Sequence, residues 1–347
     1  MGVIGLWATT TMITYFLVLA LFSCCCAYSA VRYDDYRVYR VLPKNLQQVN
    51  VLRDLDKQYF TFWTKPSHPN HNVDIMVEPN QIRNFEKTLK FLGLEENIMI
   101  ENVQNLINIS IARSSTFNWE NYQSLDRDRL WRKTRKPYEG CMGSDPNRNW
   151  DYHWMEGGAS LDLCSYSYAG PFASSEVETT SLSKFISTIA TELDGHIAFH
   201  SYGQKILIPF GHEGLEVLSN NEELVWCSYL TLKLGIKFFQ HQIGNLAAEK
   251  LAERNGTKYS VGNNPNIMCK TCVSYKLLNK DGEVLDIASG VSTDWVAGVK
   301  KVKMVYTFEL PDEGRYGFLL PADQIIPTGQ ETFDAVMVMI DELNRHF

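Results

Sequence analysis

The sequence predicts two folded parts in series: a small α+β module, then a larger α/β domain. The chain has 347 residues, and an apolar start that ends near Ala30 leaves enough length for two or three domains. Hydrophobic residues make up 45% and charged residues 21%, a globular composition that excludes wholesale disorder. From residue 31 to about residue 108, short runs with strand and helix periodicity alternate, whereas longer apolar strands follow later in the chain.

Residues 1–29 are typical of a secretory signal peptide. The apolar run over residues 12–22 is followed by the small residues Ala27 and Ser29, which favour cleavage after Ser29. An uncleaved membrane anchor is the alternative, but threonines leave too short a purely apolar stretch to favour a membrane span. We therefore expect a secreted, extracellular protein with no stable membrane association.

The charge and the cysteines both fit a secreted protein. The formal net charge of −7 gives no electrostatic footprint for a nucleic-acid backbone, so we expect no nucleic-acid partner. Five cysteines follow the signal, which implies at least one free or intermolecular thiol. Glycosylation sequons at Asn108 and Asn255 agree with secretion. A lone Cys-x-x-Cys pair is discounted as a redox or zinc half-site, and the pairing of three cysteines stays open: Cys227, Cys269 and Cys272.

The small module has the element order strand, helix, strand, strand, helix, strand. This order favours a ferredoxin-like α+β arrangement, an open antiparallel sheet with two helices on one face. His68, His71 and Asp74 could be imagined as metal ligands, but positions in a loop and at a strand start favour solvated residues. The strands are expected over residues 36–41, 59–63, 73–77 and 97–106, and the helices over residues 46–56 and 81–92.

A polar junction with a basic residue follows this module at residues 111–115. An exposed junction of this kind suits cleavage by a trypsin-like protease after Arg113. We therefore expect residues 30–113 to form a propeptide, or activation domain. An ordinary interdomain loop that happens to contain arginine is the alternative.

Short motifs in the second part occur in an order that is jointly very specific. They resemble those of the secreted zinc metallocarboxypeptidases of the pancreatic carboxypeptidase A/B type, down to the propeptide. The resemblance implies a mixed-sheet, zinc-carboxypeptidase-like α/β domain over residues 114–347, an exopeptidase activity and one zinc ion. The motifs lie at residues 131–135, 145–151, 200–202, 288–295, 307–310, 314–321 and 324–327.

The resemblance gives roles to four residues that act on the peptide bond or its carboxylate. Arg148, assisted by the amide of Asn147, would hold the C-terminal carboxylate, because a planar guanidinium suits two oxygens at once. Arg132 would polarise the scissile carbonyl. Glu309 would be the general base, and its otherwise apolar strand means that a buried carboxylate there needs a partner or a function.

Further roles concern the metal, the pocket and a disulfide. His200, which follows an apolar strand, would be a zinc ligand, although a lone histidine there is more often a core residue. Thr293 would form the floor of the pocket for the last side chain, with Phe318 and Tyr202 beside the substrate. Because Thr293 is not an acid, peptides with neutral C-terminal side chains are the expected substrates. By the same resemblance, a disulfide joins Cys141 and Cys164.

The sequence departs from the family pattern in three places. The segment that carries the family's His-x-x-Glu zinc motif is missing between Asp126 and Arg127, and we expect no other such pair to replace it. Residues 263–283 look inserted. Asp286 stands where the family has a substrate-covering tyrosine, and Tyr275 lies inside the insertion. Zinc binding is therefore doubtful, and this chain should be catalytically impaired.

Two classes of function follow. In the first, the chain is an impaired copy of a zinc carboxypeptidase, whose partners are peptide or protein C-termini and an activating trypsin-like protease. In the second, it is a secreted pseudoenzyme that binds peptide C-termini without cleaving them. The first is favoured because Arg132, Arg148, His200 and Glu309 persist while scaffold is missing, whereas a pseudoenzyme should lose its catalytic residues and keep its scaffold.

Overall fold

The structure is a computed structural model that describes residues 31–56, 60–113, 128–212, 223–263 and 287–346. The chain divides into two compact units. The larger unit, residues 33–116 and 132–347, contains both predicted parts and is the one described below. In the smaller unit the described residues include a turn in which Trp131 N donates to the carbonyl of Asp128, at 3.3 Å. The signal segment and the insertion lie outside the described residues.

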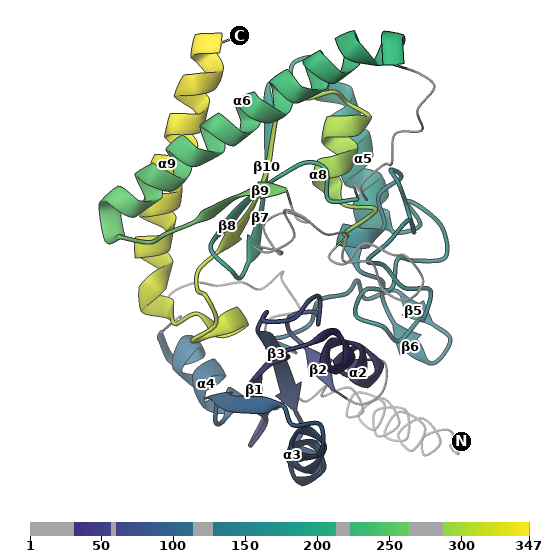
Figure 1. The fold of residues 1–347 in the computed structure, drawn as a ribbon, viewed down its shortest axis with the longest axis vertical. Helices are drawn as coiled ribbons and strands as arrows, with labels where there is room; N and C mark the ends of the chain where they lie inside the picture. Colours follow the sequence, from purple (N-terminus) through teal and green to yellow (C-terminus); the bar gives the residue numbers. More distant parts are fainter. Residues whose placement is uncertain (1–30, 57–59, 114–127, 213–222, 264–286, 347) are drawn as a thin grey trace, which may run out of the picture. The chain divides into compact units, whose positions relative to one another are not determined.

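The small module is a four-stranded antiparallel sheet in the order β2-β3-β1-β4 (Figure 1). Leu52 from one helix and Phe85 from the other are buried in the same apolar cluster as Val41 and Ile75 of the sheet, so both helices cover one face. This confirms the ferredoxin-like prediction. Its elements are β1 (Arg37–Leu42), α2 (Leu46–Asp56), β2 (Thr61–Phe62), β3 (Val73–Val77), α3 (Ile82–Phe91), β4 (Glu95–Ile100) and α4 (Val103–Arg113).

The end of this module differs from the prediction. The strand expected over residues 97–106 ends at Ile100, and the helix α4 follows. Asn102 explains the change, because its side-chain Oδ1 accepts a hydrogen bond from Asn105 N at 3.1 Å and so caps a helix start. Val103 and Ile107, four residues apart, are both buried on the helix. Arg113, expected in a polar loop, is the last residue of α4.

The larger domain is built on a second sheet in the order β7-β10-β8-β9. The sheet is mixed, as predicted: β10 is parallel to β7 and antiparallel to β8. The helices α6 and α9 cover one face, and α5 and α8 the other (Figure 1). The elements are α5 (Val177–Ile189), β7 (Gly195–Ser201), β8 (Lys205–Ile208), α6 (Glu223–Asn255), β9 (Ser260–Asn263), α8 (Ser292–Gly298), β10 (Met304–Leu310) and α9 (Ile325–His346).

Short elements before and after this sheet complete the domain. The predicted disulfide between Cys141 and Cys164 is present, with Cα atoms 5.3 Å apart. Across the described part of the chain, no helix is both long and apolar enough to span a membrane. The short elements are the pair β5 (Pro137–Tyr138) and β6 (Cys141–Met142) and the 3₁₀ turns η1 (Pro146–Arg148), η2 (Gly317–Leu319) and η3 (Ala322–Gln324).

Candidate active site

The alternation of β10 brings Glu309 to the site. Tyr306 and Phe308 point into the core beneath α6 and α9, so Thr307 and Glu309 point to the opposite face. There Thr307 Oγ1 lies 3.3 Å from Thr293 Oγ1 at the start of α8. In the parallel pairing with β7, Glu309 lies opposite His200, and the structure therefore brings together three of the predicted residues.

Burial and neighbouring cations change how Glu309 and His200 ionise. Burial raises the pKa of Glu309 to about 7, although Lys205, Arg132 and Arg148 act in the opposite direction. Burial also lowers the pKa of His200 to about 4, with Arg132 adding to the effect. At neutral pH His200 is therefore uncharged.

Arg132 is held by an aspartate to which the sequence analysis gave no role. Its Nε and Nη2 donate to Asp145 Oδ2 at 3.0 and 2.7 Å. Asp145 is 2% exposed, and its Oδ1 also accepts from Asn147 N at 3.0 Å. Burial raises the pKa of Asp145, but Arg132 and Arg148 outweigh it, so that this pKa lies below its usual range. Asp145 thus fixes Arg132 and begins the turn that carries Arg148.

The guanidinium group of Arg148 donates hydrogen bonds to two backbone carbonyl oxygens. Its Nε donates to Gly158 O at 2.9 Å and its Nη1 to Asn147 O at 2.6 Å. Asn147 faces away from the expected role, because its side-chain oxygen accepts from Ser292 N at 3.3 Å at the start of α8. The backbone of Gly158 has φ +66°, and a Cβ there would lie 1.7 Å from Ile287 O, so only glycine fits.

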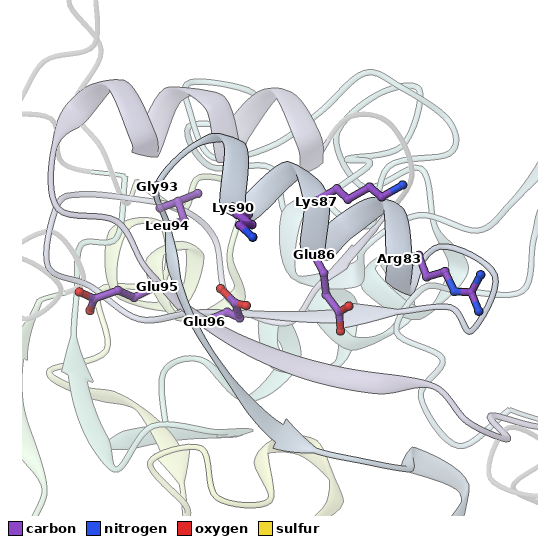
Figure 2. Close-up of a pocket in the computed structure, with 8 residues that line it drawn as sticks. All are labelled: Arg83, Glu86, Lys87, Lys90, Gly93, Leu94, Glu95 and Glu96. Atoms are coloured by element: carbon purple, nitrogen blue, oxygen red, sulfur yellow. The ribbon is translucent and has the colours of Figure 1, made fainter.

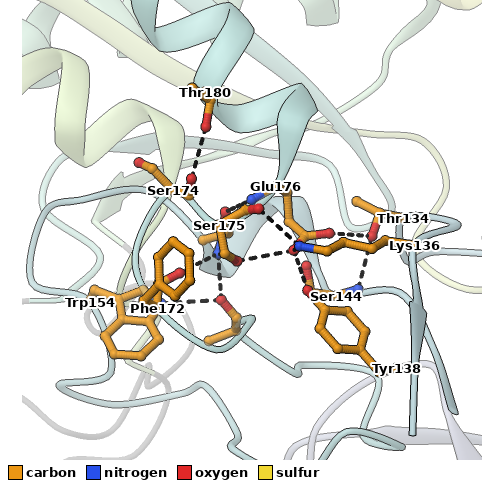
Figure 3. Close-up of polar contacts among 12 residues, drawn as sticks. Thr134, Lys136, Tyr138, Ser144, Trp154, Phe172, Ser174, Ser175, Glu176 and Thr180 are labelled. Atoms are coloured by element: carbon orange, nitrogen blue, oxygen red, sulfur yellow. Dashed lines mark hydrogen bonds and ion pairs between the residues drawn. The ribbon is translucent and has the colours of Figure 1, made fainter. Parts of the chain in front are cut away.

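The buried carboxylate of Glu176, the residue just before α5, accepts hydrogen bonds from several segments of the chain (Figure 3). Glu176 is fully buried and accepts from Thr134 Oγ1 at 2.7 Å, while Tyr138 and Ser175 donate to its other oxygen. Thr134 Oγ1 in turn accepts from Ser144 N at 3.0 Å, next to Asp145. Sequence reasoning missed Glu176, because its partners Thr134 and Tyr138 lie about 40 residues away and form no local motif with it.

Glu176 also reaches the other end of the turn. Its backbone N donates to Asn149 Oδ1 at 3.1 Å, and Asn149 follows Arg148 directly. The Asn149 amide donates to Ala169 O at 2.7 Å and to Ser175 Oγ at 2.9 Å. The segment that carries Asp145, Asn147 and Arg148 is therefore fixed at both ends.

Two of the residues expected beside the substrate are in contact, whereas Thr293 lies in α8. Thr293 is 8% exposed, and Tyr202 lies edge-on to Phe318 with ring centroids 4.9 Å apart. The neighbouring Asp294 is 1% exposed. Its oxygens accept hydrogen bonds from the backbone N of Gly211 and from the backbone N and ring Nδ1 of His212. Asp294 thus braces the loop and offers no free acid to the pocket.

The small module contacts Tyr202 and Phe318. Trp63 lies edge-on to Phe318, with ring centroids 5.3 Å apart, and Tyr202 donates from its hydroxyl to Asp74 Oδ2 at 2.6 Å. Asp74 also receives two hydrogen bonds of 2.7 Å from Arg40. The expectation that His68 and Asp74 are solvated is wrong, because they are 7% and 1% exposed. Asp74 is buried because it joins the two parts of the unit.

The described residues around His200 do not fit a zinc ion. The expectation that no His-x-x-Glu pair exists is wrong, because His153 and Glu156 have this spacing. The side chains of His153 and Glu156 form a hydrogen bond with each other, and the His153 ring stacks on the His212 ring with centroids 3.7 Å apart. Among the described residues, no three histidine, cysteine or acidic side chains form a group that could hold a metal. Asp286 and Tyr275 lie outside the described residues.

A separate cavity of about 570 Å³ lies away from the site, between α3 and β4 (Figure 2). Acidic and basic side chains alternate on its wall, among them Glu86, Lys90 and Glu96. Glu86 already accepts from Tyr39 at 2.7 Å. With charges of both signs and no convergent group of either, the cavity indicates no particular ligand.

Two families match this chain. Residues 39–109 match the carboxypeptidase activation peptide, and residues 113–335 match the family described as zinc carboxypeptidase. A zinc carboxypeptidase of Simulium vittatum is 41% identical over 221 residues, which cover 63% of this chain and 62% of that protein. Zinc carboxypeptidase A 1 of Anopheles gambiae is 38% identical over 243 residues, 67% of this chain and 48% of that protein. The chain thus spans about half to two-thirds of these relatives.

Other comparisons agree in fold. Carboxypeptidase B of Astacus astacus is 37% identical over 238 residues, which cover 67% of each chain. The structure of thrombin activatable fibrinolysis inhibitor aligns with a TM-score of 0.71 over 90% of this chain and 100% of its own, at 19% identity. Carboxypeptidase A from Helicoverpa armigera gives a TM-score of 0.67 at 18% identity, over 90% of this chain and 98% of its own. At these identities the likeness establishes the fold alone.

Proposed function

The chain belongs to the zinc carboxypeptidase family, and from this premise we propose that its larger domain recognises the C-terminal end of a peptide. The family reaction is hydrolysis of the last peptide bond with one zinc ion. Arg148 lies close to Arg132 and Asp145, whereas no group of side chains in the described part of the chain could hold a metal ion. We therefore propose an impaired carboxypeptidase that retains binding of peptide C-termini.

One observation supports recognition above all others: Arg148 is a half-buried cation whose hydrogen-bond acceptors, among the described residues, are carbonyl oxygens. A guanidinium in this state has the charge and donors to take a carboxylate. Arg132 lies beside it, already neutralised by Asp145, so Arg148 is the better carboxylate anchor of the two. Asn147 would assist Arg148 only after releasing Ser292 N.

Neutral side chains are the proposed specificity. Thr293 contributes only a hydroxyl, and Asp294 is occupied by Gly211 and His212. A Lys or Arg side chain would therefore enter a pocket without a free counter-charge, which is costly. Tyr202 and Phe318 supply apolar surface instead.

We propose that Glu309, whose pKa lies near neutrality, could accept a proton as a general base but has no metal-bound water to act on. The lack of a fitting ligand set around His200 supports this. So does β7: its residues Ile197 to Phe199 are apolar like those of an interior strand, yet Phe199 is 53% exposed and β7 is an edge strand among those described. Missing scaffold between Asp126 and Arg127 would account for both features.

We further propose that the small module is a propeptide that ends at Arg113 and that the protein is secreted. The match to an activation peptide and the cover that Trp63 and Asp74 form over the pocket support the first. The signal pattern over residues 1–29 supports the second. A trypsin-like protease would then be the activating partner.

Calorimetry on the trypsin-cleaved protein tests the proposed function. N-acetyl-phenylalanine should bind, its amide should bind at least about tenfold more weakly, and Arg148→Gln should remove the difference, because a charge-assisted hydrogen bond contributes about 1.5–3 kcal/mol. Arg254→Gln, an exposed substitution on α6, is the control. Thr293→Asp should shift the preference towards N-acetyl-lysine. Equal affinity for the acid and the amide would reject Arg148 as the anchor.

A further inference from the structure

The carbonyl oxygen of Gly158 receives hydrogen bonds from two cations that come from different parts of the chain. Arg148 Nε donates at 2.9 Å, and Lys65 Nζ, from the loop between β2 and β3, donates at 3.0 Å. Because both bonds end at one atom, the two nitrogens can be no more than 5.9 Å apart. Two positive charges therefore lie side by side at the carboxylate anchor.

Both sides of this contact are fixed by the backbone. Gly158 cannot carry a side chain, since a Cβ would collide with Ile287 O, and this sets the direction of its carbonyl. The loop that carries Lys65 is held by Arg53, which donates to Pro66 O at 2.8 Å and to Ser67 O at 2.7 Å. The fold therefore holds the loop of Lys65 where its side chain reaches the carbonyl that Arg148 also binds.

Among the described residues, neither of the two charges forms an ion pair. Arg132, the third cation nearby, forms an ion pair with Asp145. Neither Lys65 nor Arg148 has a carboxylate within ion-pair distance in the described part of the chain. Burial, followed by the field of Arg148, lowers the pKa of Lys65 to about 8, while Asp56 and Asp145 act against this from a greater distance. At neutral pH the pair therefore keeps an excess of positive charge.

We propose that Lys65 and Arg148 together bind one small carboxylate anion, so that the docked propeptide completes an anion site. This rests on the proposed role of Arg148, and Lys65 is the added element. A carboxylate has two oxygens, one for each cation, and Lys65 remains accessible to solutes. Trp63 covers Phe318, so a free amino acid or another short carboxylate fits better than a long peptide.

The consequence is a form of regulation. An anion that bridges Lys65 of the propeptide and Arg148 of the larger domain stabilises the docked state by mass action. Amino acids released by peptide hydrolysis would therefore hold the propeptide in place. A ligand that bound Arg148 alone would compete with the propeptide instead.

Chemical labelling of the full, uncleaved chain tests the site. Lys65 is acetylated with an N-hydroxysuccinimide ester at pH 7 and quantified by peptide mass spectrometry, with the exposed Lys90 as internal control. Sodium acetate, at about four times its dissociation constant, should slow labelling of Lys65 about fivefold and leave Lys90 unchanged. Sodium chloride at equal ionic strength should have no such effect.

Variants identify the partners. Arg148→Gln should abolish the protection by acetate. Acetate should raise the thermal unfolding midpoint of the unchanged protein, because it stabilises the docked state. In Lys65→Glu the chain itself supplies the carboxylate, so acetate should not raise the midpoint of that variant. No protection of Lys65, equal protection by chloride, or full protection in Arg148→Gln would each overturn the proposal. Failure of this proposal is distinguishable from failure of the proposed function, because the latter is tested on cleaved protein, which lacks Lys65, with the acid and its amide.

Discussion

Single residues fix the site through partners that are distant in sequence. Glu176 accepts hydrogen bonds from Thr134, Tyr138 and Ser175, and Lys136 Nζ lies 3.6 Å away. Burial raises the pKa of Glu176, but these donors outweigh it, so that the pKa lies below its usual range. The ionised carboxylate is therefore the form that the fold requires.

Glu176→Gln should destabilise the protein by about 1–3 kcal/mol at pH 7, because an amide can accept at only one atom and turns a donor towards other donors. A carboxyl group whose pKa is lower in the folded state stabilises the fold at pH values above its unfolded-state pKa. This stabilisation is lost as the pH falls through the folded-state pKa. The two proteins should therefore converge in acid. Urea unfolding measures the difference, and the exposed Glu178→Gln on the same helix should stay within about 0.5 kcal/mol. An unchanged stability in Glu176→Gln would show that the network contributes nothing.

At this scale the sequence predicts residues whose role lies in a motif and misses those whose role depends on tertiary contact. Arg132, Arg148, His200 and Glu309 could be assigned by resemblance; in the structure Glu309 pairs with His200, and both arginines are near enough to affect the pKa of each. Asp145, Glu176 and Lys65 each have a partner at least 13 residues away, namely Arg132, Thr134 and Gly158, and no periodicity reveals such contacts.

At the scale of elements, the helices and strands with clear periodicity were predictable. The helix over residues 46–56 and the strand over residues 73–77 have the predicted bounds. The strand expected to run to residue 106 fails because Asn102 caps a helix, a side-chain event that outweighs the apolar run. Tertiary packing of Val103 and Ile107 then stabilises α4.

The position of Arg113 at the end of α4 leads to a prediction about cleavage. Helix ends fray, so limited trypsin should cut after Arg113 and release residues 30–113. N-terminal sequencing of the large product should then begin at Ser114. Arg113→Gln should resist this cut, whereas Arg83→Gln, inside α3, should not. Cleavage confined to other sites would reject the proposed boundary.

At the scale of the whole unit, the contact between propeptide and larger domain is sensitive to acid. His71 faces His68 of its own loop, Lys205 of β8, and Arg40 of β1, which is paired with Asp74. Burial and then these positive groups lower the pKa of His71 to about 4. Protonation of His71 would add a further positive charge to this contact.

Stability should therefore fall between about pH 6.5 and pH 4, where the unfolded chain binds a proton that folded His71 does not. His71→Gln should reduce the fall in unfolding midpoint from pH 7 to pH 4.5. Some of the fall should remain, because His200 is shifted in the same direction. His241→Gln, exposed on α6, should leave it unchanged. An identical pH dependence in His71→Gln would contradict this explanation.

The central claim, that this chain binds peptide C-termini without a catalytic metal, is tested most directly by its zinc content. Purified protein is dialysed against metal-free buffer and its zinc measured by mass spectrometry, beside an assay on a substrate with C-terminal phenylalanine. Since His200 has no partner ligands in the described part of the chain, we expect far less than one zinc per chain and no zinc-dependent activity. One zinc per chain, lost together with activity in His200→Ala, would contradict the account.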